Sequence, residues 1–191
     1  MNIIPQSIPE VLLLEPRIFR DDRGYFLETY STRAFPELSP LAVFVQDNLS
    51  FSSQGTLRGL HLQHPSDQGK LVMVATGAIW DVAVDVRVGS PTFGRWVAQT
   101  LDDIERKQFY VPPGFAHGFA VLSPTAHVCY KCTDLYNPKA ELSVRFDDPD
   151  LGITWPIDSP KLSEKDGLAP FLRDIPEERL PKYVPPQVTS P

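Results

Sequence analysis

The sequence predicts an all-β domain, an antiparallel sandwich or barrel, and three observations carry that prediction. Through the first 150 residues, short β-rich runs alternate with turn signals, and no long amphipathic helical pattern interrupts them. The chain has 20 prolines and 11 glycines, which suits many tight connections between short strands. Its 191 residues are 42% hydrophobic and 22% charged, enough for one large domain with a sizeable buried core.

Ten runs have the length and the β-branched or aromatic content of strands. They lie at 11–15, 25–30, 43–49, 57–63, 71–76, 78–88, 96–101, 108–111, 118–122 and 126–135. Beyond residue 147 the strand pattern ends, and Ser163 is a candidate N-cap for a short helix. We therefore expect a single domain over 1–180 with short C-terminal helices, followed by a loosely held proline-rich tail at 181–191.

Charge and hydropathy exclude several classes of protein. The net charge of −6 and the pI near 5.2 argue against a nucleic-acid surface, which needs a basic stripe. No segment approaches the ~20 apolar residues that span a bilayer, and the N-terminus has no basic region of a secretory signal. We expect a cytoplasmic protein without nucleic-acid or membrane partners. A small anionic ligand remains compatible, because a few clustered cations outweigh the global charge locally.

Two cysteines, Cys129 and Cys132, form one C-x-x-C. Zinc would need two further ligands, and a redox pair would normally open a helix, whereas these flanks have the composition of a strand. A spacing of three sends the two thiols to opposite faces of that strand. We expect two reduced thiols without a metal or redox role.

The stretch 56–74, TLRGLHLQHPSDQGKLVMV, places polar side chains where an interior would normally have valine or leucine. Alternation puts Leu60 and Leu62 on one strand face, with His61 and Gln63 on the other. Lys70 then begins the next predicted strand. The alternative is a histidine at a solvated sheet edge and a lysine that simply starts a strand.

A second histidine lies in YVPPGFAHGF, where Pro112, Gly114 and His117 give the pattern P-x-G-x-x-H. This pattern resembles the second half of the cupin signature. In that fold the turn lets a strand enter the barrel with its histidine aimed inward.

Metal-binding cupins pair this motif with H-x-H and a glutamate, but here the second histidine of H-x-H is replaced by Gln63. Lys70 follows closely, and its ammonium would repel a divalent ion. We therefore expect no metal. The alternative is a transition metal held by His61, Gln63 and His117.

Histidine and lysine inside a barrel without metal suit proton removal from carbon beside a ketone. His61 would be the base, and Lys70 would stabilise the enolate oxygen. Inversion then needs an acid on the opposite face, for which Tyr130 in the run 126–135 is the candidate; the alternative is an aromatic of the barrel wall. A base histidine also needs an orienting carboxylate, which Asp166 in SEKD could supply.

Nine segments together resemble the dTDP-4-dehydrorhamnose 3,5-epimerase family, in that family's order and over roughly residues 1–180. They are DDRGYFLETY, FVQDNLSFS, LRGLHLQ, QGKLVMV, WDVAVDVRVGSPTFG, PPGFAHGFAVLS, YKCTDLYNP, FDDPDLGITWP and LSEKD. The resemblance implies a metal-free, cofactor-free cupin jelly-roll barrel with extra N-terminal strands. It also implies a homodimer acting on dTDP-4-dehydro-6-deoxy-D-glucose in dTDP-L-rhamnose synthesis.

The same resemblance implies residue roles. His61 would be the base and Asp166 its dyad partner, with Lys70 at the enolate and Tyr130 as the acid. The expected substrate contacts are Arg23, Phe26, Glu28, Gln46, Asn48, Arg58, Gln63, His117, Glu141 and Lys165. The N-terminal arm that carries the first three resembles a segment exchanged with the partner subunit. The two arginines would bind the diphosphate, since guanidinium binds phosphate oxygens bidentately.

The chain departs from common family residues at Leu62, Met73 and Leu135, and at Leu49 and Phe51. None of these is a proposed proton-transfer residue, so we expect inversion at both C3 and C5. The alternatives are a 3-epimerase with a single inversion, a 3,4-ketoisomerase and a non-catalytic sugar-binding cupin.

Overall fold

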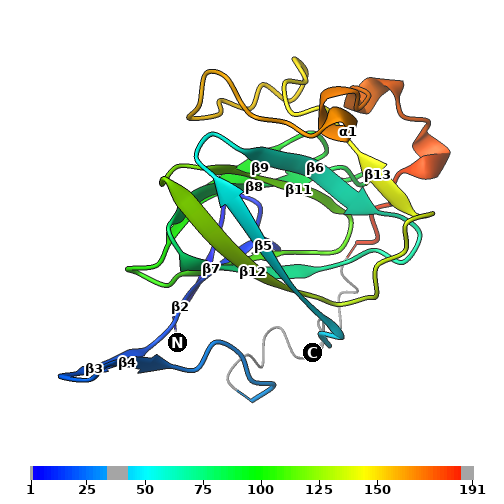
Figure 1. Ribbon diagram of the computed structural model, residues 1–191. Coiled ribbons are helices and arrows are strands. Elements are labelled where there is room, and N and C mark those ends of the chain that lie inside the picture. Colours follow the sequence, from blue (N-terminus) through cyan, green and yellow to red (C-terminus); the bar gives the residue numbers. More distant parts are fainter. Residues whose placement is uncertain (1, 34–42, 186–191) are drawn as a thin grey trace, which may run out of the picture.

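Two antiparallel sheets face each other and form a barrel, from which a two-stranded hairpin projects (Figure 1). The structure is a computed structural model and describes residues 2–33 and 43–185. The larger sheet contains, in spatial order, β1 (Asn2–Pro5), β2 (Leu12–Glu15), β10 (Gln108–Val111), β7 (Lys70–Thr76), β12 (Thr125–Cys132) and β5 (Gln46–Ser53). The smaller sheet contains β13 (Glu141–Ser143), β6 (Leu57–Gln63), β11 (Phe115–Val121), β8 (Ala78–Asp85) and β9 (Trp96–Asp102). The hairpin is β3 (Ile18–Asp21) with β4 (Gly24–Leu27).

The predicted all-β barrel is confirmed. Each of the ten predicted runs overlaps one strand, β2 or one of β4 to β12, with ends that differ by a few residues. Three strands, β1, β3 and β13, were not predicted. Each pairs with only one neighbour, and β1 ends in a proline, so their sequences lack the long alternation of a central strand.

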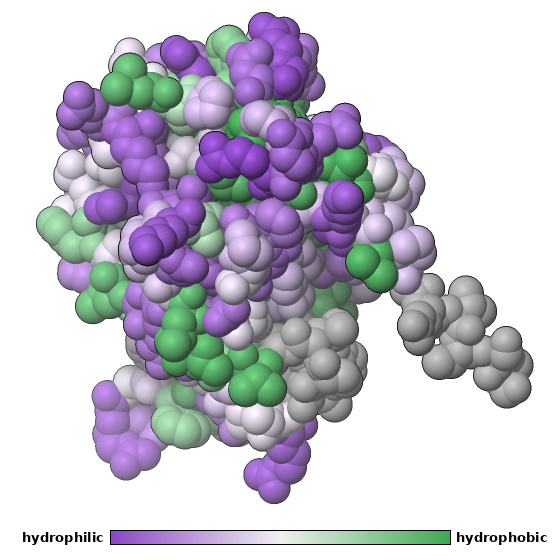
Figure 2. Space-filling view, turned by 90° about the vertical axis from the view of Figure 1, so that its right-hand side faces the viewer, coloured by the Kyte–Doolittle hydropathy of each residue, from purple (hydrophilic) through white to green (hydrophobic). Residues whose placement is uncertain are grey.

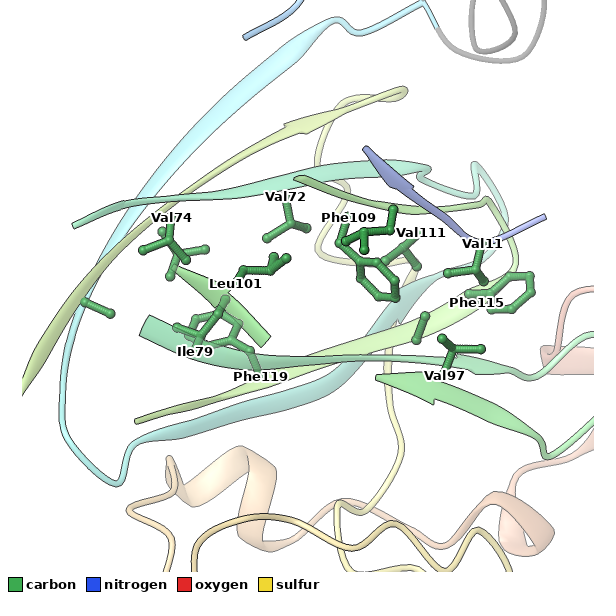
Figure 3. Packing of buried hydrophobic residues seen from close by; sticks show 14 of the residues in the cluster. Val11, Val72, Val74, Ile79, Val97, Leu101, Phe109, Val111, Phe115 and Phe119 are labelled. Carbon is green, nitrogen blue, oxygen red and sulfur yellow. The ribbon is translucent and has the colours of Figure 1, made fainter. Parts of the chain in front are cut away.

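The main core lies between the two sheets (Figure 3). Val72 and Phe109 of the larger sheet are fully buried and belong to the same cluster as Ile79 and Phe119 of the smaller one. Burial of each such side chain stabilises the fold by roughly 1.5–3 kcal/mol. This apolar packing fixes the separation of the sheets and hence the positions of polar side chains that also point between them.

The C-terminal part of the chain covers the other face of the smaller sheet. It contains the helix α1 (Glu164–Gly167) and the 3-10 turns η1 (Leu172–Asp174) and η2 (Glu177–Arg179). Leu60 and Leu62 of β6 pack there in one cluster with Leu172 and Leu180, so the alternation predicted for β6 is confirmed. The exterior seen in Figure 2 is mainly hydrophilic, with hydrophobic side chains in separate groups.

The end of the chain is tied to the barrel beyond the expected domain boundary. The Val88 amide donates to the Pro181 carbonyl at 2.8 Å, and the Tyr183 amide donates to the Val88 carbonyl at 3.0 Å. The boundary expected at 181 therefore falls inside a paired segment, and residues 186–191 of the predicted tail lie outside the described residues. Over the described ranges, no helix has the length and apolarity needed to cross a membrane.

Candidate functional site

A cavity of about 360 Å³ opens between the two sheets, and its walls come from β5, β7 and β12 on one side and β6, β11 and β13 on the other. Nine of the expected site residues line it: His61, Tyr130, Lys70, Gln46, Asn48, Arg58, Gln63, His117 and Glu141. Asp166 and Lys165 line an adjoining groove, which shares Arg58 and His61 with the cavity.

An irregularity in β6 brings Arg58 and His61 to the same cavity although they are three residues apart. The register with β11 shifts between them, so three steps along β6 match two along β11. Gly59 lies in this shift with φ of +118°, and a Cβ there would approach the Gly118 Cα to 2.7 Å. Only glycine suits this backbone conformation and the close approach of the two strands.

His61 is paired with Asp166 as the sequence predicted: its Nε2 lies 2.5 Å from Asp166 Oδ1. Asp166 sits in α1, which Ser163 caps by accepting a hydrogen bond from the Asp166 amide at 3.1 Å, confirming the predicted N-cap. Burial acts to raise the pKa of Asp166, but the hydrogen bond and charge of His61, with help from Ser163 and the Gly59 backbone, outweigh it and lower the pKa. An ionised Asp166 accepts the Nε2 proton, which leaves Nδ1 of His61 free to take a proton.

Lys70 begins β7, on the sheet opposite His61, and its Nζ donates to the His61 carbonyl at 3.4 Å. Burial lowers the pKa of Lys70, and the charges of Cys132, Asp81 and Glu141 oppose that shift. The side chain thus brings an amine hydrogen-bond donor into the cavity beside the imidazole. Such a donor stabilises negative charge that develops on a neighbouring oxygen.

A second pair, His117 with Asp81, lies deeper, and sequence reasoning missed its carboxylate. His117 Nε2 contacts the two oxygens of Asp81 at 2.9 and 3.0 Å, with side-chain exposures of 8% and 0%. Burial raises the pKa of Asp81, opposed by His117 and Lys70. The available signal was a carboxylate inside the apolar run IWDVAV, because a buried charge requires a partner.

Tyr130 of β12 lines the same cavity, as predicted from its strand. Burial raises the pKa of its phenol, and the charges of Cys132 and Glu141 add to that rise against the effect of Arg58. The phenol therefore stays protonated near neutral pH and is a hydrogen donor.

A polar chain connects the cavity rim to α1. The Tyr136 hydroxyl donates to Glu141 Oε2 at 3.0 Å, and Glu141 Oε1 lies 2.5 Å from Lys165 Nζ. Lys165 precedes Asp166, so two adjacent residues of α1 bind side chains on the paired strands β13 and β6. Tyr136 was not predicted; its only signal was an aromatic residue in an otherwise polar loop.

The expected amide contacts are engaged within the protein. Gln46 Nε2 donates to Asn48 Oδ1 at 3.0 Å, and Asn48 Nδ2 donates to Cys132 Sγ at 3.5 Å. The amide of Gln63 binds only backbone groups of nearby loops. As the spacing predicted, Cys132 and Cys129 lie on opposite faces of β12, where Cys132 lines the cavity and Cys129 lines another pocket. Both thiols are free.

The three expected contacts on the arm lie away from the cavity of their own chain. Arg23 pairs with Asp21 at 2.5 Å, and its side chain is 89% exposed. Phe26 is 71% exposed, and Glu28 accepts a hydrogen bond from Ser31 at 3.0 Å. Within one chain, the structure does not bring these residues together with the other eleven.

The residue types in the cavity do not suit a metal ion. Across residues 2–33 and 43–185, no three His, Cys, Asp or Glu side chains are grouped as ligands. Gln63 stands where H-x-H would have its second histidine, and a protonated Lys70 in the same cavity opposes a cation.

The model of the dTDP-4-dehydrorhamnose 3,5-epimerase family matches residues 5–174. An epimerase of that name from Pseudomonas aeruginosa is 53% identical over 162 residues, covering 84% of this chain and 90% of the relative. One from Neisseria gonorrhoeae is 52% identical over 167 residues and 87% of this chain, which spans only about half of that relative (51%). The crystal structure of a dTDP-6-deoxy-D-glucose-3,5-epimerase from Legionella pneumophila, in complex with dTDP-4-keto-L-rhamnose, superimposes with a TM-score of 0.94. It is 48% identical, over 96% of this chain and 99% of that one.

Proposed function

The chain belongs to the dTDP-4-dehydrorhamnose 3,5-epimerase family of isomerases, and we propose that it inverts C3 and C5 of dTDP-4-dehydro-6-deoxy-D-glucose. The product would enter synthesis of dTDP-L-rhamnose or a related deoxysugar. One observation carries the proposal: an oriented imidazole, a buried lysine and a protonated phenol line a single cavity. We expect the protein to act in the cytoplasm.

The proposed reaction needs only proton transfers. His61 Nδ1 removes the proton from a carbon beside the C4 ketone, and the C–H electron pair becomes the enolate, whose oxygen accepts a hydrogen bond from Lys70. Tyr130 then gives its phenolic proton to the same carbon from the opposite face, and the ketone reforms. Exchange with solvent returns a proton to Tyr130 and removes one from His61 before the next inversion. A positioned base contributes about 10²–10⁴-fold to rate, and a donor at the oxyanion about 10²–10³-fold.

C3 and C5 both flank the C4 ketone, so one lysine at the enolate oxygen serves proton removal from either carbon. A single base also suffices when both carbons present their protons to the same side of the sugar. The acid imposes the stricter requirement, because Tyr130 must reach the opposite side at each carbon. The proposed catalytic set is therefore His61, Lys70 and Tyr130, with Asp166 as the fourth residue, which orients His61.

Substrate binding uses the remaining polar wall. Arg58 would bind the diphosphate, since its planar fork matches phosphate oxygens. The further contacts proposed within the chain are Gln46, Asn48, His117, Glu141 and Lys165, which line the cavity or the adjoining groove.

Arg23, Phe26 and Glu28 would reach the cavity of a second copy through exchange of N-terminal arms in a homodimer. The β3–β4 hairpin supports this proposal, because an isolated two-stranded hairpin is only marginally stable in water. Its aromatic residues are widely exposed, as are Leu49 and Phe51 on β5. Such apolar exposure on a projecting hairpin and on a sheet face fits burial against another subunit.

The first experiment incubates the protein with dTDP-4-dehydro-6-deoxy-D-glucose in D₂O and locates deuterium by NMR. Deuterium with inversion at both C3 and C5 is expected. Incorporation at C3 alone would identify a 3-epimerase, and movement of the ketone would identify a ketoisomerase. Binding without any exchange would overturn the enzymatic proposal.

A second experiment tests arm exchange by co-expressing two inactive chains, His61→Asn and the double variant Arg23→Ala/Glu28→Ala. If the arm acts in the partner, each mixed dimer has one intact site, and random pairing restores about a quarter of wild-type activity. Each variant expressed alone is the control. Absence of rescue in a dimeric mixture would show that the arm does not complete the partner's site.

A further inference from the structure

Three glutamines of the cavity wall use their side chains to bind the backbone of one loop. Gln46, Gln63 and Gln68, here called the glutamine clamp, line the cavity from β5, β6 and the loop after β6. The segment they bind, residues 134–137, is part of the connection from β12 to β13 and is called loop 134–137 below. It holds Tyr136, whose ring also lines the cavity.

Gln63 makes most of these bonds and is 4% exposed. Its Nε2 donates to the carbonyls of Ser66 at 2.6 Å and Leu135 at 3.2 Å, while its Oε1 accepts from the Asn137 amide at 2.8 Å. Both N–H groups of the amide are therefore engaged, and one acceptor position is left. This leaves Gln63 little capacity to bind a ligand directly.

The other two glutamines bind backbone groups of Asp134 and Tyr136. Gln68 Nε2 donates to the Asp134 carbonyl at 2.8 Å, and Gln46 Oε1 accepts from the Tyr136 amide at 2.8 Å. Each of four consecutive residues, 134 to 137, thus has one backbone group bound by the clamp. Backbone groups of a loop would otherwise bind water and allow several conformations.

The clamped loop fixes where an aromatic ring stands. Tyr136 is 54% exposed, and among the described residues its side chain has one hydrogen bond, to Glu141. A ring at the cavity rim that is half open to solvent has area left to cover a ligand. Its position depends on the loop, because a single hydrogen bond from the hydroxyl does not determine the orientation of the ring.

We propose that Gln63 is a positioning residue that, with Gln46 and Gln68, holds loop 134–137 in place and so presents Tyr136 as a preformed wall of the nucleotide-sugar site. The identity of the ligand rests on the proposed function, whereas the ordering of the loop does not. A wall ordered before binding avoids the entropy cost of ordering a loop around the ligand. The clamp therefore acts on substrate affinity and leaves proton transfer at His61 and Tyr130 unchanged.

A double-mutant cycle tests the proposal. Gln63→Met keeps the length of the side chain and removes its three bonds to backbone; we expect KM to rise about tenfold with kcat within about twofold. Tyr136→Ala should raise KM similarly, and adding Gln63→Met to it should raise KM no further, because the clamp acts through that ring. The matched control is Gln54→Met, which removes one 2.8 Å bond to the Leu122 carbonyl at a turn outside the cavity and should leave KM unchanged.

If the two substitutions raised KM additively, the proposal would be overturned. Additivity would show that Gln63 binds the substrate itself or supports the site by another route. If Gln63→Met fails to fold, the same cycle with Gln68→Met decides between these outcomes. A ligand-free measurement separates this proposal from the proposed activity: amide hydrogen exchange at Tyr136 and Asn137 should accelerate in Gln63→Met. Unchanged exchange would refute the clamp even in an active epimerase, and accelerated exchange would support it even if the substrate proved different.

Discussion

Two imidazole–carboxylate pairs face the same cavity from neighbouring strands, and they differ in how much water reaches them. His61 and His117 are directly paired across β6 and β11. The His61–Asp166 pair has side-chain exposures of 31% and 4%, against 8% and 0% for His117–Asp81. The chemistry of the two pairs is the same, and their environments are not.

The pKa values of the two buried carboxylates shift in opposite directions. Burial opposes ionisation in both, but the hydrogen bond and charge of His61, with smaller contributions from Ser163 and the Gly59 backbone, lower the pKa of Asp166, while burial prevails at Asp81 and raises its pKa. An imidazole held by a stably ionised carboxylate at a half-open position suits proton exchange with a ligand. The buried pair suits a fixed hydrogen-bonding role, and this contrast leads to four predictions.

The largest expected effect is the loss of the base. His61→Asn should lower kcat by about 10²–10⁴-fold, because the amide cannot accept the substrate proton, while the affinity for dTDP measured by calorimetry stays within about twofold. Retention of more than about a tenth of the wild-type rate would remove His61 from that role.

Asp166→Asn should lower kcat less, by about 10²-fold, because the imidazole remains but loses its ionised partner. Steady-state kinetics on the sugar nucleotide measure this effect. Asp150→Asn serves as the control, since it alters an exposed carboxylate that binds only Arg173 among side chains. Full activity of Asp166→Asn would show that the ionised carboxylate beside His61 does not contribute to catalysis.

His117→Asn should raise KM about tenfold and change kcat by less, as expected for a residue that binds the substrate without transferring its proton. The KM and kcat of this variant are compared with those of His61→Asn under identical conditions. A fall in kcat as large as that of His61→Asn would break the contrast between the two pairs.

The smallest effect concerns the pH dependence of stability. Since the folded pKa of Asp166 lies below its ordinary 3.8, its stabilisation is present above pH 3.8 and is lost as pH falls through the lowered value. Asp166→Asn should therefore reduce the free energy of unfolding at pH 7 by about 1 kcal/mol. This difference between variant and wild type should disappear in acid.

Asp81 should behave oppositely, because its raised pKa makes folding less favourable as pH rises above 3.8 through the raised value. Asp81→Asn should therefore be at least as stable as the wild type at pH 7 and lose that advantage on acidification. Urea unfolding from pH 3 to 7 measures both variants. If the free energies of unfolding of the two variants changed with pH in the same way, the pKa values of the two carboxylates would not shift in opposite directions.

Local sequence pattern determined the strands and the faces of single side chains. Alternation in β6 placed His61 and Gln63 toward the interior and Leu60 and Leu62 against the C-terminal segment, because the two-residue period is a property of the strand backbone. The same rule separated Cys129 from Cys132. Family motifs, which record positions and not contacts, added Asp166 as the partner of His61.

Tertiary structure decided which side chains meet and what they remain free to do. His61 and Asp166 are 105 positions apart, and packing of the C-terminal segment on β6 brings them together. A register shift, invisible to strict alternation, turns Arg58 toward the same cavity. The pairing of Asp81 with His117 and the engagement of both amide N–H groups of Gln63 also emerge only in three dimensions. The physical reason is that alternation depends on the backbone of one strand, whereas burial, pairing and free hydrogen-bonding capacity depend on every element packed around a side chain.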